Sequence, residues 1–140
     1  MLETILVAHD GSDGARKAFD AAVELASRVG ATLHMVSVEE DLPRYAQTID
    51  EAVESKQEED TYFGQLAAQC RRRAALSGID LRTSVISGNV IKAIVDCARD
   101  GRFDLLVIGY TGHSRIYDHL WGGTSQNLAR MAPCSVMVVK

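Results

Sequence analysis

Short apolar runs alternate with stretches of helical periodicity along this chain, and together they predict five strands separated by four helices. The strand-like runs lie at residues 5–8, 33–38, 81–86, 105–108 and 136–139. Between these runs, apolar residues recur three or four positions apart, which predicts helices over about 15–29, 51–76, 91–98 and 122–131. Ser12 is placed to cap the first helix and Gly30 to end it.

This alternation of strand and helix is typical of an α/β protein. We expect one domain, residues 1–140, built on an open parallel five-stranded sheet with helices on both faces. Residues 81–86 alternate apolar and polar side chains as an edge strand does, whereas 5–8 and 105–108 are apolar on both faces as central strands are. These patterns predict the strand order 3-2-1-4-5, which reverses between the first and fourth strands. Ligands of such sheets bind at the carboxyl ends of the strands that flank the reversal.

The composition narrows the classes of function that remain. Hydrophobic residues make up 46% of the 140 residues and charged residues 24%, which excludes global disorder and a coiled coil. The net charge of −4 argues against nucleic acid as the main partner, because duplex binders need a basic face. Three cysteines without CxxC spacing indicate neither a disulfide framework nor a zinc site. With no secretory signal and no apolar stretch of membrane-spanning length, we expect a cytoplasmic protein that binds no membrane.

Most of the acidity belongs to residues 39–60, which hold nine acidic residues and only two basic ones, Arg44 and Lys56. Pro43 and the lack of apolar periodicity predict that the first half of this segment is an exposed, mobile loop. A solvated connection is the favoured interpretation, and a lid over a ligand is the minor alternative. Because acidic side chains repel phosphate, we expect the segment to lie away from any bound phosphate or to pair with the basic run at 71–73.

Candidate chemistry gathers at the two strand ends that flank the predicted reversal. The first strand is followed by HDG at 9–11, and the fourth by GYTG at 109–112. A glycine directly after a buried strand lets a phosphate approach the backbone, and glycines at 122–123 open the next helix, where free N–H groups favour an anion. Glycine spacing alone is a weak signal, and a plain turn with a helix cap also explains it. Asp10 has two open roles, as a ligand contact or as the N-cap of the first helix.

Three segments together resemble the universal stress protein family. They are VAHDGS at 7–12, the spaced glycines after the fourth strand, and APCSVMVV at 132–139, and they span essentially the whole chain. Gly109, Gly112 and Gly122 resemble that family's ATP-binding signature of glycine, two residues, glycine, nine residues, glycine, then Ser or Thr. The next residue here is Gly123, which removes one expected hydroxyl contact, and the two hydroxyl residues that follow it are the expected replacements.

The resemblance implies a Rossmann-like, adenine nucleotide alpha hydrolase-like fold that binds ATP as a regulator of shape or of partner choice in stress responses. It implies that adenosine lies against Ala8, Asp10 and the backbone of Met35. The residues that would cradle the phosphates are Gly109, Gly112, His113, Ser114, Gly122, Gly123, Thr124 and Ser125. Valine in place of Gly109 or Gly122 is then expected to abolish ATP binding while leaving the fold intact. A Mg²⁺ ion would be held through the phosphates and needs no protein cage.

Two other functions stay open. The family has members that do not bind ATP, which makes a protein-interaction module the runner-up; the regulatory partner protein is unidentified under either interpretation. A weak ATPase is the third interpretation, although the sequence has no P-loop and no readable catalytic constellation. The four histidines share no metal-ligand spacing. We therefore assign no catalytic residue and no metal ligand.

The last strand suggests how the protein assembles. Residues 136–139 are apolar on both faces, yet the predicted order places them at an edge of the sheet, where neither charge nor proline prevents pairing. We expect a homodimer in which the two C-terminal strands pair about a two-fold axis, and the family resemblance supports the same arrangement. The alternative is that a helix or residues 117–121 fold back over this strand within one chain.

Overall fold

The structure, a computed structural model, describes residues 2–40, 48–110 and 123–140. In chain order the elements are β1 (Thr4–Ala8), α1 (Asp13–Val29), β2 (Thr32–Glu40), α2 (Ile49–Ala75), β3 (Arg82–Gly88), α3 (Val90–Asp100), β4 (Leu105–Gly109), α4 (Gly123–Met131) and β5 (Ser135–Val139). Every strand and helix that the hydrophobic pattern predicts is present, with ends that differ by a few residues. None of the described helices is both long enough and apolar enough to cross a membrane.

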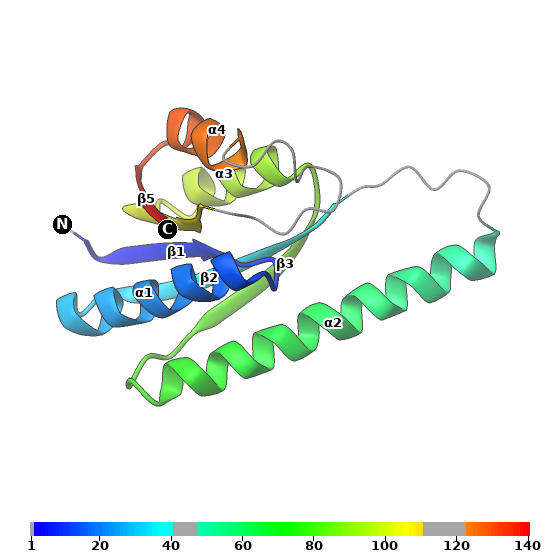
Figure 1. Cartoon of the computed structure of the whole chain (residues 1–140), viewed down its shortest axis with the longest axis horizontal. Helices are drawn as coiled ribbons and strands as arrows, with labels where there is room; N and C mark the ends of the chain where they lie inside the picture. The colour runs from blue at the N-terminus through cyan, green and yellow to red at the C-terminus, as the bar shows by residue number, and fades with distance from the viewer. Residues whose placement is uncertain (1, 41–47, 111–122) are drawn as a thin grey trace.

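The five strands form one parallel sheet in the order β3-β2-β1-β4-β5, as the sequence predicts. Helices α1 and α2 cover one face, and α3 and α4 cover the other (Figure 1). The order reverses between β1 and β4, which are hydrogen-bonded neighbours with Val7 opposite Val107. The carboxyl ends of these two strands therefore lie side by side, where open α/β sheets bind ligands.

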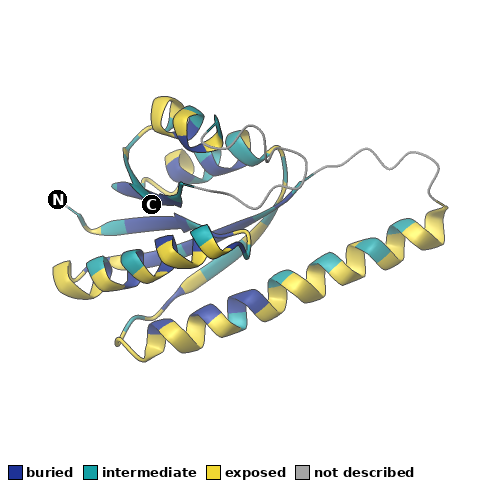
Figure 2. Cartoon of the chain, viewed as in Figure 1, coloured by how far each residue is buried: buried dark blue, intermediate teal, exposed yellow. Residues whose placement is uncertain are grey.

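The central strands are apolar on both faces because each face has its own buried core. Ile5 and Val7 of β1 pack into the core beneath α1 and α2. Leu6, between them, packs with Leu106 and Leu128 into the core beneath α3 and α4. Strand side chains alternate between faces, so a strand buried on both sides reads as a continuous apolar run. Figure 2 shows this burial concentrated in the sheet and on the inner sides of the helices.

Helix α1 has the local sequence of a well-terminated amphipathic helix. The Ser12 hydroxyl accepts a hydrogen bond from Ala15 N at its start, as an N-cap residue does. Its C-cap is Gly30, with φ of 72°, a left-handed conformation that glycine adopts at little cost. Ser12 is thus confirmed as the N-cap, and the alternative that Asp10 caps this helix is wrong.

The acidic segment differs from its prediction. Its first residues extend β2 to Glu40, and the side chain of Glu39 is buried and paired with Lys56 of α2. Residues 41–47, where a loop was expected, lie outside the described residues. The expected pairing with the basic run at 71–73 is wrong for Glu39, and two of those arginines have other partners: Arg73 binds Asp20 and Arg71 donates to Thr83.

Gly109, the last residue of β4, lies against the first turn of α1. A Cβ added at Gly109 would lie 2.7 Å from the carbonyl oxygen of Gly14 and 3.1 Å from Ala15 N. Both neighbours are backbone atoms, so they cannot move aside without shifting the helix. The expectation that valine at Gly109 leaves the fold intact is therefore wrong, because this glycine is required for helix–sheet packing.

We predict that Gly109→Ala lowers the free energy of unfolding by roughly 1–3 kcal/mol, the usual cost of overpacking a tight contact. The matched control is Gly64→Ala in α2, where a Cβ would meet nothing within 4 Å. That change should raise stability by roughly 0.5–1 kcal/mol through helix propensity. Urea denaturation of both variants measures the difference. Equal stability of the two variants would contradict the proposed backbone contact.

Candidate functional site

The loop between β1 and α1 is held by hydrogen bonds from its own side chains. Gly11 N donates to His9 Nδ1 (3.0 Å), and Ser12 N donates to Asp10 Oδ1 (2.9 Å). On the outer side, Arg16 donates to the carbonyl oxygen of Gly11 (2.7 Å). These bonds hold the loop at the strand-order reversal, and the Asp10 residue within it is exposed. Ala8, immediately before the loop, is half-buried on the α3 side of the sheet.

Helix α2 reaches the same loop through Tyr62. The Tyr62 hydroxyl donates to the carbonyl oxygen of Asp10 at 3.4 Å. A Cβ added at Gly11 would lie 1.7 Å from that hydroxyl oxygen, and the φ of Gly11 is +89°. The position therefore needs glycine for its backbone conformation and for the close approach of the tyrosine. A signal for this contact was absent from the sequence, because Tyr62 lies fifty-one positions beyond Gly11.

Met35 does not lie at the strand ends. It is 1% exposed in the middle of β2, where it is paired in register with Val7 on one side and Thr83 on the other. A neighbouring strand thus lies on each side of the Met35 backbone, so this backbone is not available to the edge of an adenine base. The assignment of Met35 to the nucleotide contact is wrong.

Val38 is the residue of β2 whose backbone lies just beyond the carboxyl end of β1. His9 N donates to Val36 O (2.9 Å), so the backbone groups of Val36 face β1. Alternate residues of a strand direct their N–H and C=O to the same side, so Val38 does the same beyond the end of β1. Because β1 ends at Ala8, opposite Val36, these groups of Val38 have no strand partner in the described part of the chain.

Glu39 follows Val38, and its carboxylate is 4% exposed although it is charged. It accepts a hydrogen bond from the Lys56 ammonium, which also pairs with Asp60 one turn further along α2 (3.4 Å). The Glu39 hydrogen bond is the main reason why the pKa of Lys56 is raised above its usual value. This pair joins α2 to the end of β2, and the spacing of charges along the sequence did not indicate it.

On the β4 side, the structure describes part of the predicted phosphate cradle. Gly109 ends β4, and the next residue, Tyr110, donates its N–H to Val139 O (2.9 Å). Helix α4 begins at Gly123, with Thr124 exposed and Ser125 buried in its first turn. Gly112, His113, Ser114 and Gly122 lie outside the described residues.

His9 is a buried and neutral histidine. Its side chain is 3% exposed, and its ring packs against Phe19 with ring centroids 5.8 Å apart. Burial lowers the pKa of His9 from 6.5 to about 4, and the nearby charge of Asp10 only partly offsets that effect. A ring that accepts the Gly11 N–H at Nδ1 carries its single proton on Nε2 at neutral pH.

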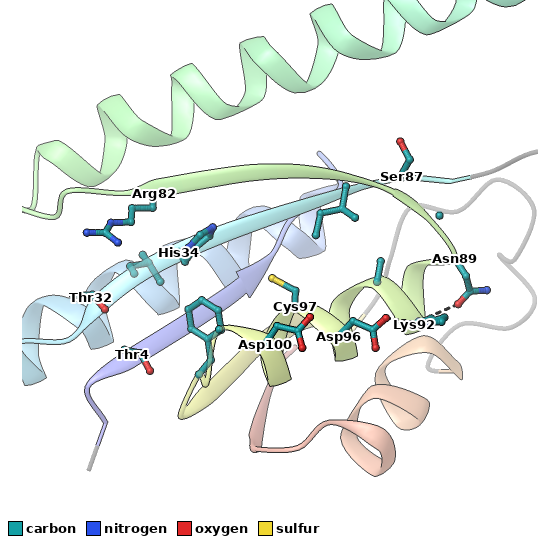
Figure 3. A pocket seen from close by; sticks show the side chains of 16 residues that line it. Thr4, Thr32, His34, Arg82, Ser87, Asn89, Lys92, Asp96, Cys97 and Asp100 are labelled. Atoms are coloured by element: carbon teal, nitrogen blue, oxygen red, sulfur yellow. Dashed lines mark hydrogen bonds and ion pairs between the residues drawn. The ribbon is translucent and has the colours of Figure 1, made fainter.

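A cavity of about 820 Å³ lies away from the carboxyl ends of β1 and β4. It runs between α3 and the β2–β3 side of the sheet. Figure 3 shows His34 on β2 and Cys97, Asp96 and Asp100 on α3 at its two sides. Its acidic side chain Asp96 is already paired, with Lys92 (2.6 Å) and with Arg99 (3.0 Å). No group of three or more His, Cys, Asp or Glu residues in the described chain could hold a metal ion.

The comparisons with known proteins agree with this fold. A family model for the universal stress protein family matches residues 1–140. A universal stress protein of Thermus aquaticus is 32% identical over 144 aligned residues, which cover 100% of both chains. The solved structure of UspA from Lactobacillus plantarum has a TM-score of 0.88 at 29% identity, covering 99% of this chain and 98% of that one. A universal stress protein solved in complex with cAMP has a TM-score of 0.75 at 25% identity, covering 99% and 97%.

We predict that the stability of the protein falls as pH decreases through the range in which unfolded His9 would become protonated. The folded pKa is about 4 against 6.5 in the unfolded chain, so the unfolded state binds more protons between these values. The free energy of unfolding should therefore fall by up to about 1.4 kcal/mol per pH unit below pH 6.5. Urea denaturation from pH 7 to pH 5 measures this slope.

His9→Gln should flatten that slope, whatever its effect on absolute stability. His34→Gln is the comparison variant, because burial also lowers the pKa of His34, a half-buried side chain hydrogen-bonded to Ser84. An unchanged slope in His9→Gln would show that His9 is not its source.

Proposed function

This chain belongs to the universal stress protein family, and on that premise we propose that it binds ATP at the carboxyl ends of β1 and β4 as a regulatory ligand. The bound nucleotide would set the shape of the protein or its choice of a partner protein in a stress response. The observation that carries the proposal is the strand-order reversal between β1 and β4, which has a glycine-rich signature after β4 on one side and unpaired backbone of β2 on the other.

The residues around the crevice fit the two ends of an adenine nucleotide. The N–H and C=O of Val38 offer one donor and one acceptor, the pair that an adenine edge requires, and they take the role first assigned to Met35. Ala8 supplies an apolar surface and Asp10 a carboxylate for ribose hydroxyls. The universal stress protein solved with cAMP supports an adenine nucleotide as the ligand class.

The phosphates would lie over the β4–α4 connection. The N-terminus of α4 presents first-turn backbone N–H groups and the positive end of a helix dipole, which favour an anion. We assign the phosphate contacts to Gly109, Gly112, His113, Ser114, Gly122, Gly123, Thr124 and Ser125. Mg²⁺ would bind through the phosphate oxygens.

The two competing functions differ from this proposal in what they require of the crevice. A protein-interaction module needs no nucleotide, so its crevice would bind none. A weak ATPase would convert bound ATP to ADP through positioning and electrostatics alone. A cytoplasmic location is also part of the proposal, and it is supported by the three cysteines, all of which are free thiols.

We predict that nucleotide released from the purified, denatured protein is ATP by mass spectrometry. In calorimetric titrations Gly122→Val should weaken ATP binding about tenfold or more, because its methyl groups would occupy phosphate space. Gly122 replaces Gly109 in this test, since Gly109 is needed for packing against α1. Gly64→Ala, at an exposed position of α2 where a Cβ would meet nothing within 4 Å, is the matched control and should bind ATP normally.

The possible results separate the three functions. Recovered ATP and a selective loss in Gly122→Val support the proposal. A nucleotide-free protein with no measurable heat of binding favours the interaction module. Accumulation of ADP during incubation with ATP favours the weak ATPase.

We also propose a homodimer through β5. This strand lies at the edge of the sheet, and its last four side chains, residues 136–139, are each only half-buried. Because Tyr110 N bonds to Val139 O, the backbone of Val139 faces β4. Its neighbour Val138 therefore directs its N–H outward, where a second β5 could accept it.

We predict that light scattering at micromolar concentration finds dimers of the unmodified protein and monomers of Val138→Pro. Proline removes the outward donor without removing a hydrogen bond to β4. Val138→Thr keeps the N–H and the branched shape and should remain dimeric. Circular dichroism confirms that each variant is folded. A monomeric unmodified protein would overturn this proposal.

A further inference from the structure

A second cavity, of about 210 Å³, is lined by residues of α1 and α2 on the face of the sheet that these helices cover. The polar residues that line it are His9, Arg16, Asp20, Gln69, Cys70 and Arg73. Its volume is below the roughly 300 Å³ of the smallest sites for drug-sized ligands, so it is too small for a nucleotide. It lies behind the β1–α1 loop and includes none of the residues assigned to ATP.

His9 gives this cavity a buried hydrogen-bond donor. Its Nδ1 accepts the Gly11 N–H, which leaves the ring proton on Nε2. That N–H has no hydrogen-bond partner in the described chain, although His9 as a whole is only 3% exposed. Every fully buried side-chain polar atom of the described residues has a partner, so the N–H must open on space that solvent can reach. His9 lines this cavity, so its Nε2–H is available to donate to a ligand that binds there.

Two guanidinium groups stand at the rim of the cavity, each oriented by a bond to the protein. Arg16 donates one N–H to Gly11 O (2.7 Å), and Arg73 donates Nε–H to Asp20 Oδ1 (2.5 Å). An arginine has five N–H donors, so both retain donors for a ligand. Because these bonds hold the side chains in place, less conformational entropy is lost when a ligand binds.

The net charge and the hydrogen-bond donors of the lining residues indicate which class of ligand this cavity fits. Two arginines exceed the single carboxylate, Asp20, which leaves a net charge of +1 around a neutral imidazole. Burial raises the pKa of the Cys70 thiol, so it is neutral and does not repel an anion. The Gln69 amide adds another N–H donor. Donors on several sides with an excess of positive charge match the acceptor-only surface of an oxyanion.

We propose that this cavity binds a small oxyanion, a carboxylate or inorganic phosphate, through the Nε2–H of His9 and the guanidinium groups of Arg16 and Arg73. This site is independent of the nucleotide site, so either can exist without the other.

The test is NMR detection of the His9 imidazole while sodium phosphate or sodium acetate is added at pH 7 and constant ionic strength. The His9 signals are identified by their loss in His9→Gln. The Nε2 resonance should shift saturably, with a midpoint on the order of 1 mM for a ligand of so few atoms. Saturation with phosphate alone or acetate alone identifies which oxyanion fits. A shift that is linear with both anions, or equal to that produced by sodium chloride, overturns the proposal.

Variants locate the binding. Arg73→Gln and Arg16→Gln should each raise the midpoint about tenfold or more, because each removes a charged donor. Arg28→Gln is the matched control. Arg28 is an exposed arginine of α1 that pairs with Glu24, and its loss should leave the midpoint of the titration unchanged. Gly122→Val should also leave the midpoint unchanged, which separates this site from the phosphate end of the nucleotide site. Equal midpoints in Arg73→Gln, Arg16→Gln and Arg28→Gln would overturn the proposal.

Discussion

The close approach between the end of β4 and the first turn of α1 decides where the crevice of this protein lies. Only a glycine at position 109 leaves room for the carbonyl of Gly14, because a Cβ would lie 2.7 Å from that oxygen. A second contact of the same kind brings Tyr62 of α2 onto Gly11, where again a side chain has no room. Through these two contacts both helices of one face are fixed against the strand ends. The loop between β1 and α1 is thereby held at the strand-order reversal.

The HDGS run at 9–12 supplies the side-chain hydrogen bonds that hold this loop. Three successive side chains accept the N–H groups that the turn leaves unpaired: His9 accepts from Gly11, Asp10 from Ser12, and Ser12 from Ala15. Buried N–H groups need partners, so each of these residues contributes to the fold before any ligand is considered. The neutral state of His9 belongs to the same arrangement, since a protonated ring could not accept the Gly11 N–H at Nδ1.

The sequence predicted the strands, the helices and their order because apolar periodicity and strand patterns report burial directly. The same patterns predicted that the strand order reverses between β1 and β4, which the fold confirms. It failed where the answer depended on register: periodicity cannot tell that Met35 lies opposite Val7 and that β2 continues four residues past the end of β1. It also failed to predict that Gly109 is needed for packing against α1, because a glycine needed for a tertiary contact and one needed for a phosphate look identical in sequence. The Glu39–Lys56 pair joins two elements whose approach only the fold determines.

Helix α2 shows how one element can be held by two kinds of force. Its buried residues, Leu66, Ala67, Cys70 and Ala74, all belong to the C-terminal half, which hydrophobic burial holds against the sheet. The N-terminal half buries no apolar side chain and depends on the capping box of Thr48 and Glu51, the Glu39–Lys56 pair and the Tyr62 contact. Removing Lys56 would leave the buried carboxylate of Glu39 without its partner, which costs more than an exposed pair contributes. Because Lys56 binds Glu39 and Tyr62 donates to the carbonyl oxygen of Asp10, the polar half of α2 is attached to the carboxyl end of β2 and to the loop that follows β1.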